Sequence, residues 1–175
     1  MNEERPDDLA PLGGAMRAEW QAEEEELTRA AYDQWRHGRS FADLLAECAT
    51  RGDTVHVTAA TATFRGPVVD VGADRFTIAA GPGPVDIALG ADVVIGIDSA
   101  AAVEAGERPA AGGTLRARLL EHETSGATVL IGTSDGELRG VITVGADHVV
   151  VAHGELARAV AISSIIWIRL AEGGA

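Results

Sequence analysis

Two kinds of hydrophobic spacing divide this chain of 175 residues. Over residues 15–38, apolar side chains recur at steps of four or seven, which predicts an amphipathic helix that stops at Gly38. The acidic run at 23–26 is expected to form the wet side of this helix. Residues 1–14 mix acids with Pro and Gly and are predicted to be a flexible tail. The apolar face of the helix comprises Met16, Trp20, Leu27, Ala31 and Trp35.

A second, shorter helix is predicted just before the spacing of apolar residues changes from helical to alternating. Ser40 and Asp43 have the spacing of a helix cap, and an i, i+3, i+4, i+7 apolar face follows, ending at Cys48. Beyond Gly52 the apolar residues alternate with polar ones, which predicts five short strands separated by glycine-rich turns. The alternating positions are Val55, Val57 and Ala59, then Phe64, Val68 and Val71, then Phe76 and Ile78, then Val85, Ile87 and Leu89, then Val93, Ile95 and Ile97.

The same pattern then occurs again. Placing Ser40 over Thr114, an offset of 74, aligns Gly52 with Gly126 and the run 64–66 with 138–140. After a single deletion near Pro67 the offset becomes 73 and the match continues to the last strand. Matched glycine, threonine and apolar positions interrupted by one gap predict an internal duplication. The two units span 40–98 and 114–170, and the Ala-, Gly- and Glu-rich segment 99–113 is predicted to be a linker.

Each unit is therefore one helix followed by five strands. Strands this short and this close in sequence can pair antiparallel and curl into a closed sheet. The sequence predicts a mainly β protein of the α+β class, with two tandem five-stranded antiparallel barrels, each preceded by a short helix. Aromatic residues make up only 4% of the chain, so aliphatic side chains must fill most of the core.

The motifs of both units resemble those of the Sm-like (Lsm/Hfq-type) family. The shared features are the helix-then-five-strand order, an apolar-x-Gly-x-apolar step in the second strand, and a following Asp-x-apolar step. The resemblance implies a small SH3-type barrel and assembly edge to edge through the last two strands, so that the linked pair acts as a built-in dimer or as part of a ring. The residues that carry it are Phe64, Gly66, Val68, Asp74 and Phe76 in the first copy and Leu138, Gly140, Ile142, Asp147 and Val149 in the second.

Charge narrows the range of partners. The net charge is −13, with fourteen Arg, no Lys and 27 acidic residues. Residues 1–50 and 51–175 are both acidic, so neither part has the basic excess with which proteins neutralise phosphates. DNA is therefore not an expected partner, and RNA is disfavoured by the net charge.

The expected location is the cytoplasm. Cys48 is the single cysteine and cannot form an internal disulfide, and the acidic N-terminus has no leader pattern. The longest apolar stretch, 159–168, is interrupted by two serines and is shorter than the about 20 residues that span a bilayer. No membrane association is expected.

Four residues are candidates for contacts with a protein partner: Trp20 and Trp35 on the first helix, and Ile165 and Trp167 on the last strand. The last strand is apolar on both faces, whereas a barrel wall with one wet side should alternate. Its outer face must be covered by the first barrel, by the Trp20 and Trp35 helix, or by a partner chain. An uncovered Trp167 and Ile165 would form an interaction patch.

Two equivalent arginines, Arg65 and Arg139, are the candidate contacts for an anion or RNA. The other interpretation is that they are inherited surface charge. His148 and His153 lack cysteine or acidic neighbours at ligand spacing, so no metal site is predicted. No nucleophile, base or phosphate-binding loop occurs in a catalytic arrangement, and the sequence predicts no enzyme activity and no cofactor.

These observations predict a non-catalytic assembly or adaptor protein that acts through protein-protein contacts or self-association of its tandem barrels. The alternative is an RNA-associated regulator of the Sm-like type that binds RNA through a local Arg patch. A third hypothesis, a barrel that binds a metal or small ligand, rests on the histidines alone.

Overall fold

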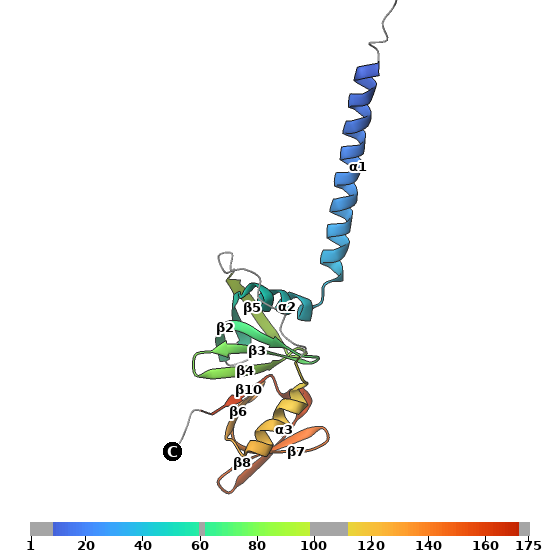
Figure 1. Ribbon diagram of the computed structural model, residues 1–175. Helices are drawn as coiled ribbons and strands as arrows, with labels where there is room; N and C mark the ends of the chain where they lie inside the picture. The colour runs from blue at the N-terminus through green and yellow to red at the C-terminus, as the bar shows by residue number, and fades with distance from the viewer. Residues whose placement is uncertain (1–8, 60–61, 99–111, 172–175) are drawn as a thin grey trace, which may run out of the picture. The chain divides into compact units, whose positions relative to one another are not determined.

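The computed structural model describes residues 9–59, 62–98 and 112–171, with side chains from residue 20 onward. A long helix comes first, and the order of one short helix and five strands then occurs twice (Figure 1). The first repeat, residues 41–98, contains α2 (Phe41–Arg51), β1 (Thr54–Ala59), β2 (Ala62–Val71), β3 (Arg75–Ala80), β4 (Gly83–Ala88) and β5 (Val93–Asp98). The second repeat, residues 115–170, contains α3 (Leu115–Ser125), β6 (Val129–Thr133), β7 (Gly136–Val144), β8 (His148–His153), β9 (Leu156–Ala161), the short 3-10 helix η1 (Ile162–Ser164) and β10 (Trp167–Leu170).

The long helix α1 (Leu9–Gly38) lies in a separate unit, residues 1–40. It ends at Gly38 as expected but begins at Leu9, inside the segment that the sequence assigned to a flexible tail. Pro11 is compatible with this earlier start, because proline is tolerated in the first turn of a helix, where its missing N–H has no partner within the helix. The remainder of the predicted tail, residues 1–8, lies outside the described residues.

Every element of the first repeat has a counterpart at the predicted offset in the second. The helices α2 and α3 correspond residue for residue at 74, and β3 and β4 correspond to β8 and β9 at 73. The offset changes in β2, where the pairing with β3 shifts between Val68 and Asp70. This β-bulge holds the extra residue of the first repeat, close to the gap that the sequence comparison put near Pro67.

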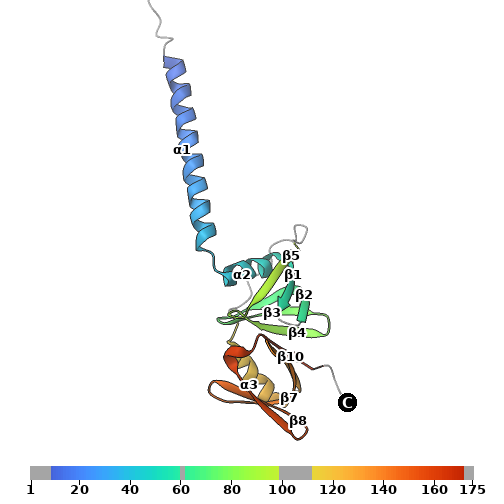
Figure 2. The same ribbon diagram turned by 180° about the vertical axis from the view of Figure 1, so that it is seen from behind.

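The described strands form one antiparallel sheet of ten strands that is not closed. Its order is β5-β1-β2-β3-β4-β10-β6-β7-β8-β9. Within the first repeat β5 pairs with β1, and β4 pairs on its far side with β10 of the second repeat (Figure 2). The mainly antiparallel β architecture and the N-terminal helices agree with the sequence prediction, whereas two separately closed barrels are not what the strand order describes.

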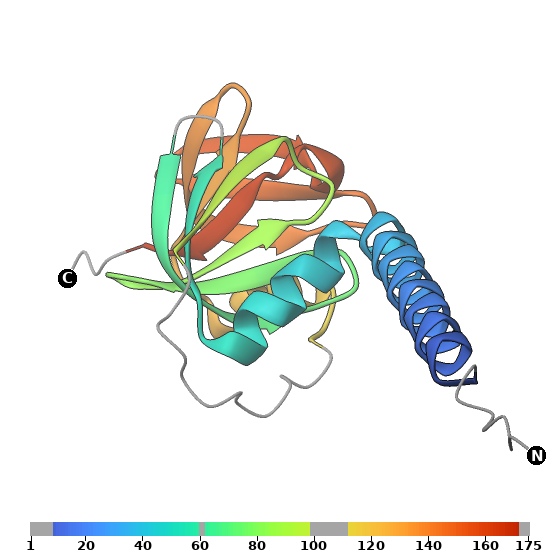
Figure 3. The same ribbon diagram turned by 90° about the horizontal axis from the view of Figure 1, so that it is seen from above.

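Each repeat has its own hydrophobic cluster beneath its helix. Leu45 and Cys48 of α2 are fully buried in the first cluster, as the helical spacing predicted, and α2 lies against the strands of its repeat (Figure 3). Leu115 and Leu119 of α3 do the same in the second cluster. Burial raises the pKa of the Cys48 thiol, with Asp53 adding to the effect, so the thiol stays protonated at neutral pH.

The glycines of the second strands explain how the sheet bends tightly. A Cβ added at Gly66 would lie 2.0 Å from the backbone oxygen of Ala79, and one added at Gly140 would lie 2.2 Å from that of Ala152. Only glycine allows the backbones of neighbouring strands to approach this closely. The residues are the glycines of the two repeated motifs, so the motif has the same structural role in both repeats.

The segment between the repeats is only partly described. Residues 99–111, most of the predicted linker, lie outside the described part, and Gly112 forms an isolated parallel bridge with Gly72. Within the described residues, no helix has both the length and the apolar character needed to cross a membrane.

Candidate assembly interface

The two repeats are joined through an antiparallel strand pair, which we call the internal joint. It pairs the fourth strand of the first repeat, β4, with the last strand of the second repeat, β10. Trp167 lies opposite Ile87 and Ile168 opposite Asp86. The backbone N–H of Ala88 donates to the carbonyl oxygen of Ile166 at 2.9 Å. The joint makes the sheet continuous from one repeat to the other.

Trp167 anchors the second repeat in the core of the first. It is 1% exposed and belongs to the first hydrophobic cluster, where its ring lies edge-to-face on Phe64 with the ring centroids 5.1 Å apart. Gly132 on the neighbouring strand makes room for it, because a Cβ there would lie 2.0 Å from the indole Nε1. Ile165 and Ile168 pack instead into the second cluster.

The doubly apolar strand is therefore covered inside the chain, by the first repeat. This was one of the three covers considered from the sequence. Both candidates for partner contacts are buried within the chain. Trp167 is 1% exposed and packs in the core of the first repeat, whereas Ile165, which precedes β10, is 2% exposed and packs in the core of its own repeat. The strand is apolar on both faces because one face packs against the core of the first repeat and the other against the core of the second.

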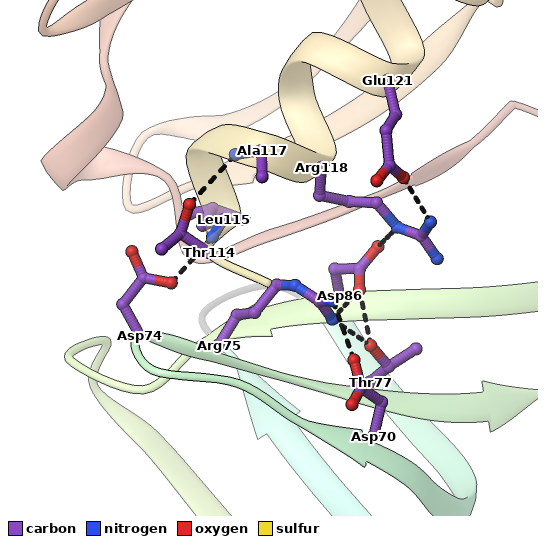
Figure 4. Close-up of polar contacts among 10 residues, drawn as sticks. All are labelled: Asp70, Asp74, Arg75, Thr77, Asp86, Thr114, Leu115, Ala117, Arg118 and Glu121. Carbon is purple, nitrogen blue, oxygen red and sulfur yellow. Dashed lines mark hydrogen bonds and ion pairs between the residues drawn. The ribbon is translucent and has the colours of Figure 1, made fainter. Parts of the chain in front are cut away.

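A buried polar network lies on the other face of the internal joint (Figure 4). Asp86 of β4 is 2% exposed, and its Oδ1 accepts from Arg75 Nη1 at 2.8 Å and from the Thr77 hydroxyl at 2.6 Å. Arg75, 6% exposed, also donates to Asp70 Oδ2 at 2.7 Å. Each buried charge has an opposite charge within hydrogen-bonding distance, which offsets part of the cost of burying it. Arg75 Nε is buried without a hydrogen-bond partner among the described residues.

Helix α3 is tied to the first repeat through the same network. Arg118 Nε donates to the second carboxylate oxygen of Asp86 at 2.9 Å, and Arg118 also pairs with Glu121 at 2.7 Å. At the start of α3, the backbone N–H of Leu115 donates to Asp74 Oδ1 at 2.7 Å. Asp74 therefore has a second role beyond its predicted place in a turn, because it satisfies a helix N–H that has no partner in its own helix.

This buried network was not among the features predicted from the sequence. One signal was available: Asp86 stands between Val85 and Ile87 in a strand whose neighbours on both sides are buried. A charged residue in such a strand must find a partner, but the sequence did not indicate that the partners would come from β3 and from the helix of the other repeat.

The outermost strands of the sheet are β5 and β9, and each pairs with one other strand in the part of the chain that the structure describes. On β5, Val94 is 70% exposed, although its counterpart is the buried Trp167. On β9, five of six residues are exposed, whereas in the corresponding strand β4 Val85, Asp86 and Ile87 are buried. Unlike their counterparts β10 and β4, the two edge strands have a neighbouring strand on one side only among the described residues.

A groove of about 360 Å³ runs beside the β9 edge. Leu138 and Val160 line it, and their counterparts in the first repeat, Phe64 and Ile87, are the residues that meet Trp167. The groove in the second repeat thus corresponds to the place that the tryptophan fills in the first. The full lining consists of residues 133–138, 158–161 and Ser164.

The candidate aromatic residues of α1 are exposed along the helix. Trp20 is 73% and Trp35 51% exposed, and Tyr32 lies beside Trp35 with the ring centroids 5.7 Å apart. The guanidinium of Arg39 lies 4.5 Å from the centroid of the Trp35 ring, a cation-π contact. The apolar face predicted for this helix is thus present and unburied in its own unit.

The two candidate arginines lie on separate strands with four others between them, β2 for Arg65 and β7 for Arg139. Both are exposed. Arg65 Nη2 donates to Asp98 Oδ2 at 3.2 Å and its Nε lies 3.0 Å from His56 Nε2, so it already has an acidic partner. The hydrogen bond with His56, followed by the one from Arg65, lowers the pKa of the Asp98 carboxyl.

The histidines singled out in the sequence do not form a metal site in the described residues, where no group of three or more His, Cys, Asp or Glu could hold an ion. His148 Nδ1 lies 2.9 Å from Asp147 Oδ1. This contact lowers the pKa of the exposed Asp147 carboxyl. The arrangement is that of a local hydrogen bond at a turn.

His122 of α3 gives the fold a pH dependence that we can test. It is the counterpart of Cys48, and its Nε2 is buried with no hydrogen-bond partner among the described residues. Burial, followed by the positive charge of Arg118, lowers the pKa of His122 below its usual 6.5. The unfolded chain therefore takes up a proton that the folded chain resists, and stability that is complete above about pH 6.5 is lost as the pH falls toward the lowered pKa.

We therefore expect His122→Cys, which copies the first repeat, to flatten the pH dependence of stability. Between pH 6.5 and 5 the free energy of unfolding of the wild type should fall more steeply than that of the variant, by at most about 1.4 kcal/mol per pH unit for one proton. Urea denaturation at a series of pH values measures both slopes. Parallel profiles would show that His122 does not contribute.

In comparisons with known proteins, no family model matches the chain, and a search of curated proteins found no match.

Proposed function

We propose that this protein is a non-catalytic assembly protein that recruits a partner by strand addition at the open edges of its sheet. The observation that carries the proposal is the pair of exposed edge strands, β5 and β9, at the two ends of the ten-strand order. Natural proteins usually guard such edges with lysine, proline or a bulge, because an unpaired edge is a template for another strand. Here β9 carries a single charged residue, Arg158, and its other five residues are Ala, Leu and Val.

The likeness to Sm-like proteins supports the same proposal. In that family neighbouring barrels join through their last two strands, and in this chain the internal joint uses the corresponding strands of the two repeats, β4 and β10. We propose that each repeat acts as a small open barrel and that α1, with its exposed Trp20 and Trp35, offers a further contact for a partner.

The hypothesis of an RNA-associated regulator has less support. It depends on Arg65 and Arg139, and Arg65 is engaged by Asp98 on the same face of the sheet. The net charge of −13 opposes association with a phosphate backbone unless a local patch overcomes it. The strand neighbours are His56 for Arg65 and Leu130 for Arg139, and Arg169 lies on the far side of Leu130. Strand pairing thus puts one further basic residue near each candidate arginine, which is few for a patch that must overcome the net charge.

Light scattering of the purified chain over a concentration series tests the proposal. We expect a mass above the 18.1 kDa of a single chain, rising with concentration, and an ultraviolet spectrum without excess absorbance at the wavelength of nucleic acid. A protein that stays strictly monomeric and co-purifies with nothing would contradict an assembly role. Bound RNA at low salt would favour the regulator instead.

A further inference from the structure

The internal joint provides a template for a second joint that the chain leaves open. If β4 of one repeat accepts β10 of the other, then the counterpart of β4 in the second repeat, β9, has the same kind of edge. The counterpart of β10 in the first repeat is β5. These are the two free edges of the described sheet, one at each end of the strand order, and each is the complement of the other.

We infer that the partner is a second copy of this chain, bound head to tail, with β5 of one molecule added antiparallel to β9 of the next. This inference rests on the proposed assembly function and names its partner. Transferring the register of the internal joint puts Val94 opposite Val160, Ile95 opposite Ala159, and Gly96 opposite Arg158. The bond from Ala88 to Ile166 transfers to a bond from the N–H of Ala161 to the carbonyl of Val93.

The groove beside β9 accepts the side chain that this register delivers. Val94 stands where Trp167 stands in the internal joint, so addition of β5 inserts it between Leu138 and Val160. It changes from 70% exposed to buried on association, and apolar burial is the main favourable term. A valine fills less of the groove than a tryptophan would, which makes the joint between chains weaker than the joint within a chain.

Charge favours unlike ends over like ends. Arg158 is exposed on β9, and opposite it β5 has Gly96, a residue without a side chain. The next residue of β5 on the same face is Asp98, diagonal to Arg158 and within reach of its long side chain. Joining β9 to β9 would bring two Arg158 side chains to one edge, and joining β5 to β5 would do the same with Asp98.

The other contacts of the internal joint have counterparts between two chains, but these counterparts involve different types of side chain. The ion pair of Arg118 with Asp86 becomes a contact of Leu44 with Ala159, both apolar. The cap that Asp74 gives to α3 is kept, because its counterpart Asp147 is an exposed acid that would accept from the first turn of α2 in the next chain. The joint between chains therefore combines an apolar centre with one retained polar cap.

Two variants that each block one edge distinguish this arrangement from every other. Val94→Asp puts a carboxylate into a groove that already contains Asp135 and Glu137. Ala159→Pro removes an N–H that points out of the edge, because Ala159 is the counterpart of Asp86, which is in the same alternation as Ala88. Pro84, two residues before Asp86 and in the same alternation, is an example of proline at such a position in the corresponding strand. The control is Val141→Asp, which adds the same charge at an exposed position of β7, away from both edges.

Sedimentation velocity on the full chain gives the readout. We expect each edge variant alone to sediment as a single chain and their equimolar mixture to form a species of twice that mass, because one free β9 and one free β5 remain to pair. The Val141→Asp control should assemble like the wild type. The double variant Thr58→Gly with Val94→Trp, which copies the Gly132 and Trp167 pair, should tighten association by about tenfold or more.

The outcomes separate this inference from the proposed function. If the wild type assembles and both edge variants assemble equally well, the partner binds elsewhere and the head-to-tail joint is wrong while an assembly role stands. If one edge variant alone forms dimers, like edges are pairing and the inference is again wrong. A wild type that remains a monomer at every concentration and captures no other chain overturns both.

Discussion

Asp86→Leu should lower the free energy of unfolding by about 3–5 kcal/mol, the loss typical of removing one partner from a buried ion pair. The carboxylate of Asp86 accepts from Arg75, from the Thr77 hydroxyl and from Arg118, and it is 2% exposed. Without it, the guanidinium of Arg75 stays buried and keeps only the half-buried Asp70 as an acidic partner. Arg118 loses less, since its side chain is 31% exposed and still pairs with Glu121.

Urea denaturation at fixed protein concentration, followed by the fluorescence of Trp167, measures this loss. Replacing Trp20 and Trp35 by Phe leaves Trp167 as the single tryptophan, so the signal reports on the internal joint. Adding Arg75→Met to Asp86→Leu should restore most of the stability, because an apolar pair replaces the buried charge. Asp92→Leu, at an exposed position, removes the same charge and should change stability by less than about 0.5 kcal/mol. A loss as large in Asp92→Leu as in Asp86→Leu would refute the role of the network.

Local pattern was sufficient to predict the elements of this fold. The alternation of apolar residues located the strands, the i, i+3, i+4, i+7 spacing located α2, and the bulge at Val68–Asp70 lies close to the gap in the repeat alignment. Gly66 and Gly140 were identified from the sequence as motif glycines. The reason that glycine is required there, the close approach of the next strand, is visible only in the structure. These features depend on residues near one another in sequence, where hydrophobic period and turn chemistry are informative.

The pairing of the repeats could be predicted only in part. The doubly apolar strand that includes Ile165 and Trp167 indicated that something must cover its outer face, and the first repeat was among the three candidates. Choosing between them requires knowing that β4 presents a free edge to β10, which is a contact between residues about 80 positions apart. Periodicity has no information on such long-range partners. The same limit hid the contact of Arg118 with Asp86.

The prediction of two closed barrels did not consider that the strands of the two repeats compete for the same sheet edges. Five short strands can close on themselves or pair with a neighbouring repeat, and both satisfy the backbone hydrogen bonds of the edge. In this chain the edge of β4 is satisfied by β10, so the sheet continues into the second repeat. A duplicated sequence always contains this alternative, because any edge that one repeat offers has its complement in the other.

The largest packing effect should come from Trp167→Ala, which we expect to lower the free energy of unfolding by about 3–5 kcal/mol, the usual range for truncating a buried aromatic residue. The indole is the contact of the second repeat with the core of the first, edge-to-face on Phe64, so its loss weakens the internal joint directly. Trp35→Ala, at a 51% exposed position, is the matched truncation and should have little effect.

Gly132 gives this prediction an independent test, since the indole fits only while that residue has no side chain. Gly132→Ala puts a Cβ 2.0 Å from Nε1 and should force the ring out of its place, whereas Gly96→Ala, where the nearest atom is 3.7 Å away, should be tolerated. In the Trp167→Ala background nothing remains to clash, so the effect of Gly132→Ala should largely disappear, and the two losses should not add. Circular dichroism during urea denaturation measures all four chains of this cycle. Equal losses from Gly132→Ala with and without the tryptophan would mean that the glycine is required by the backbone, and that the ring does not hold the repeats together in the way its position implies.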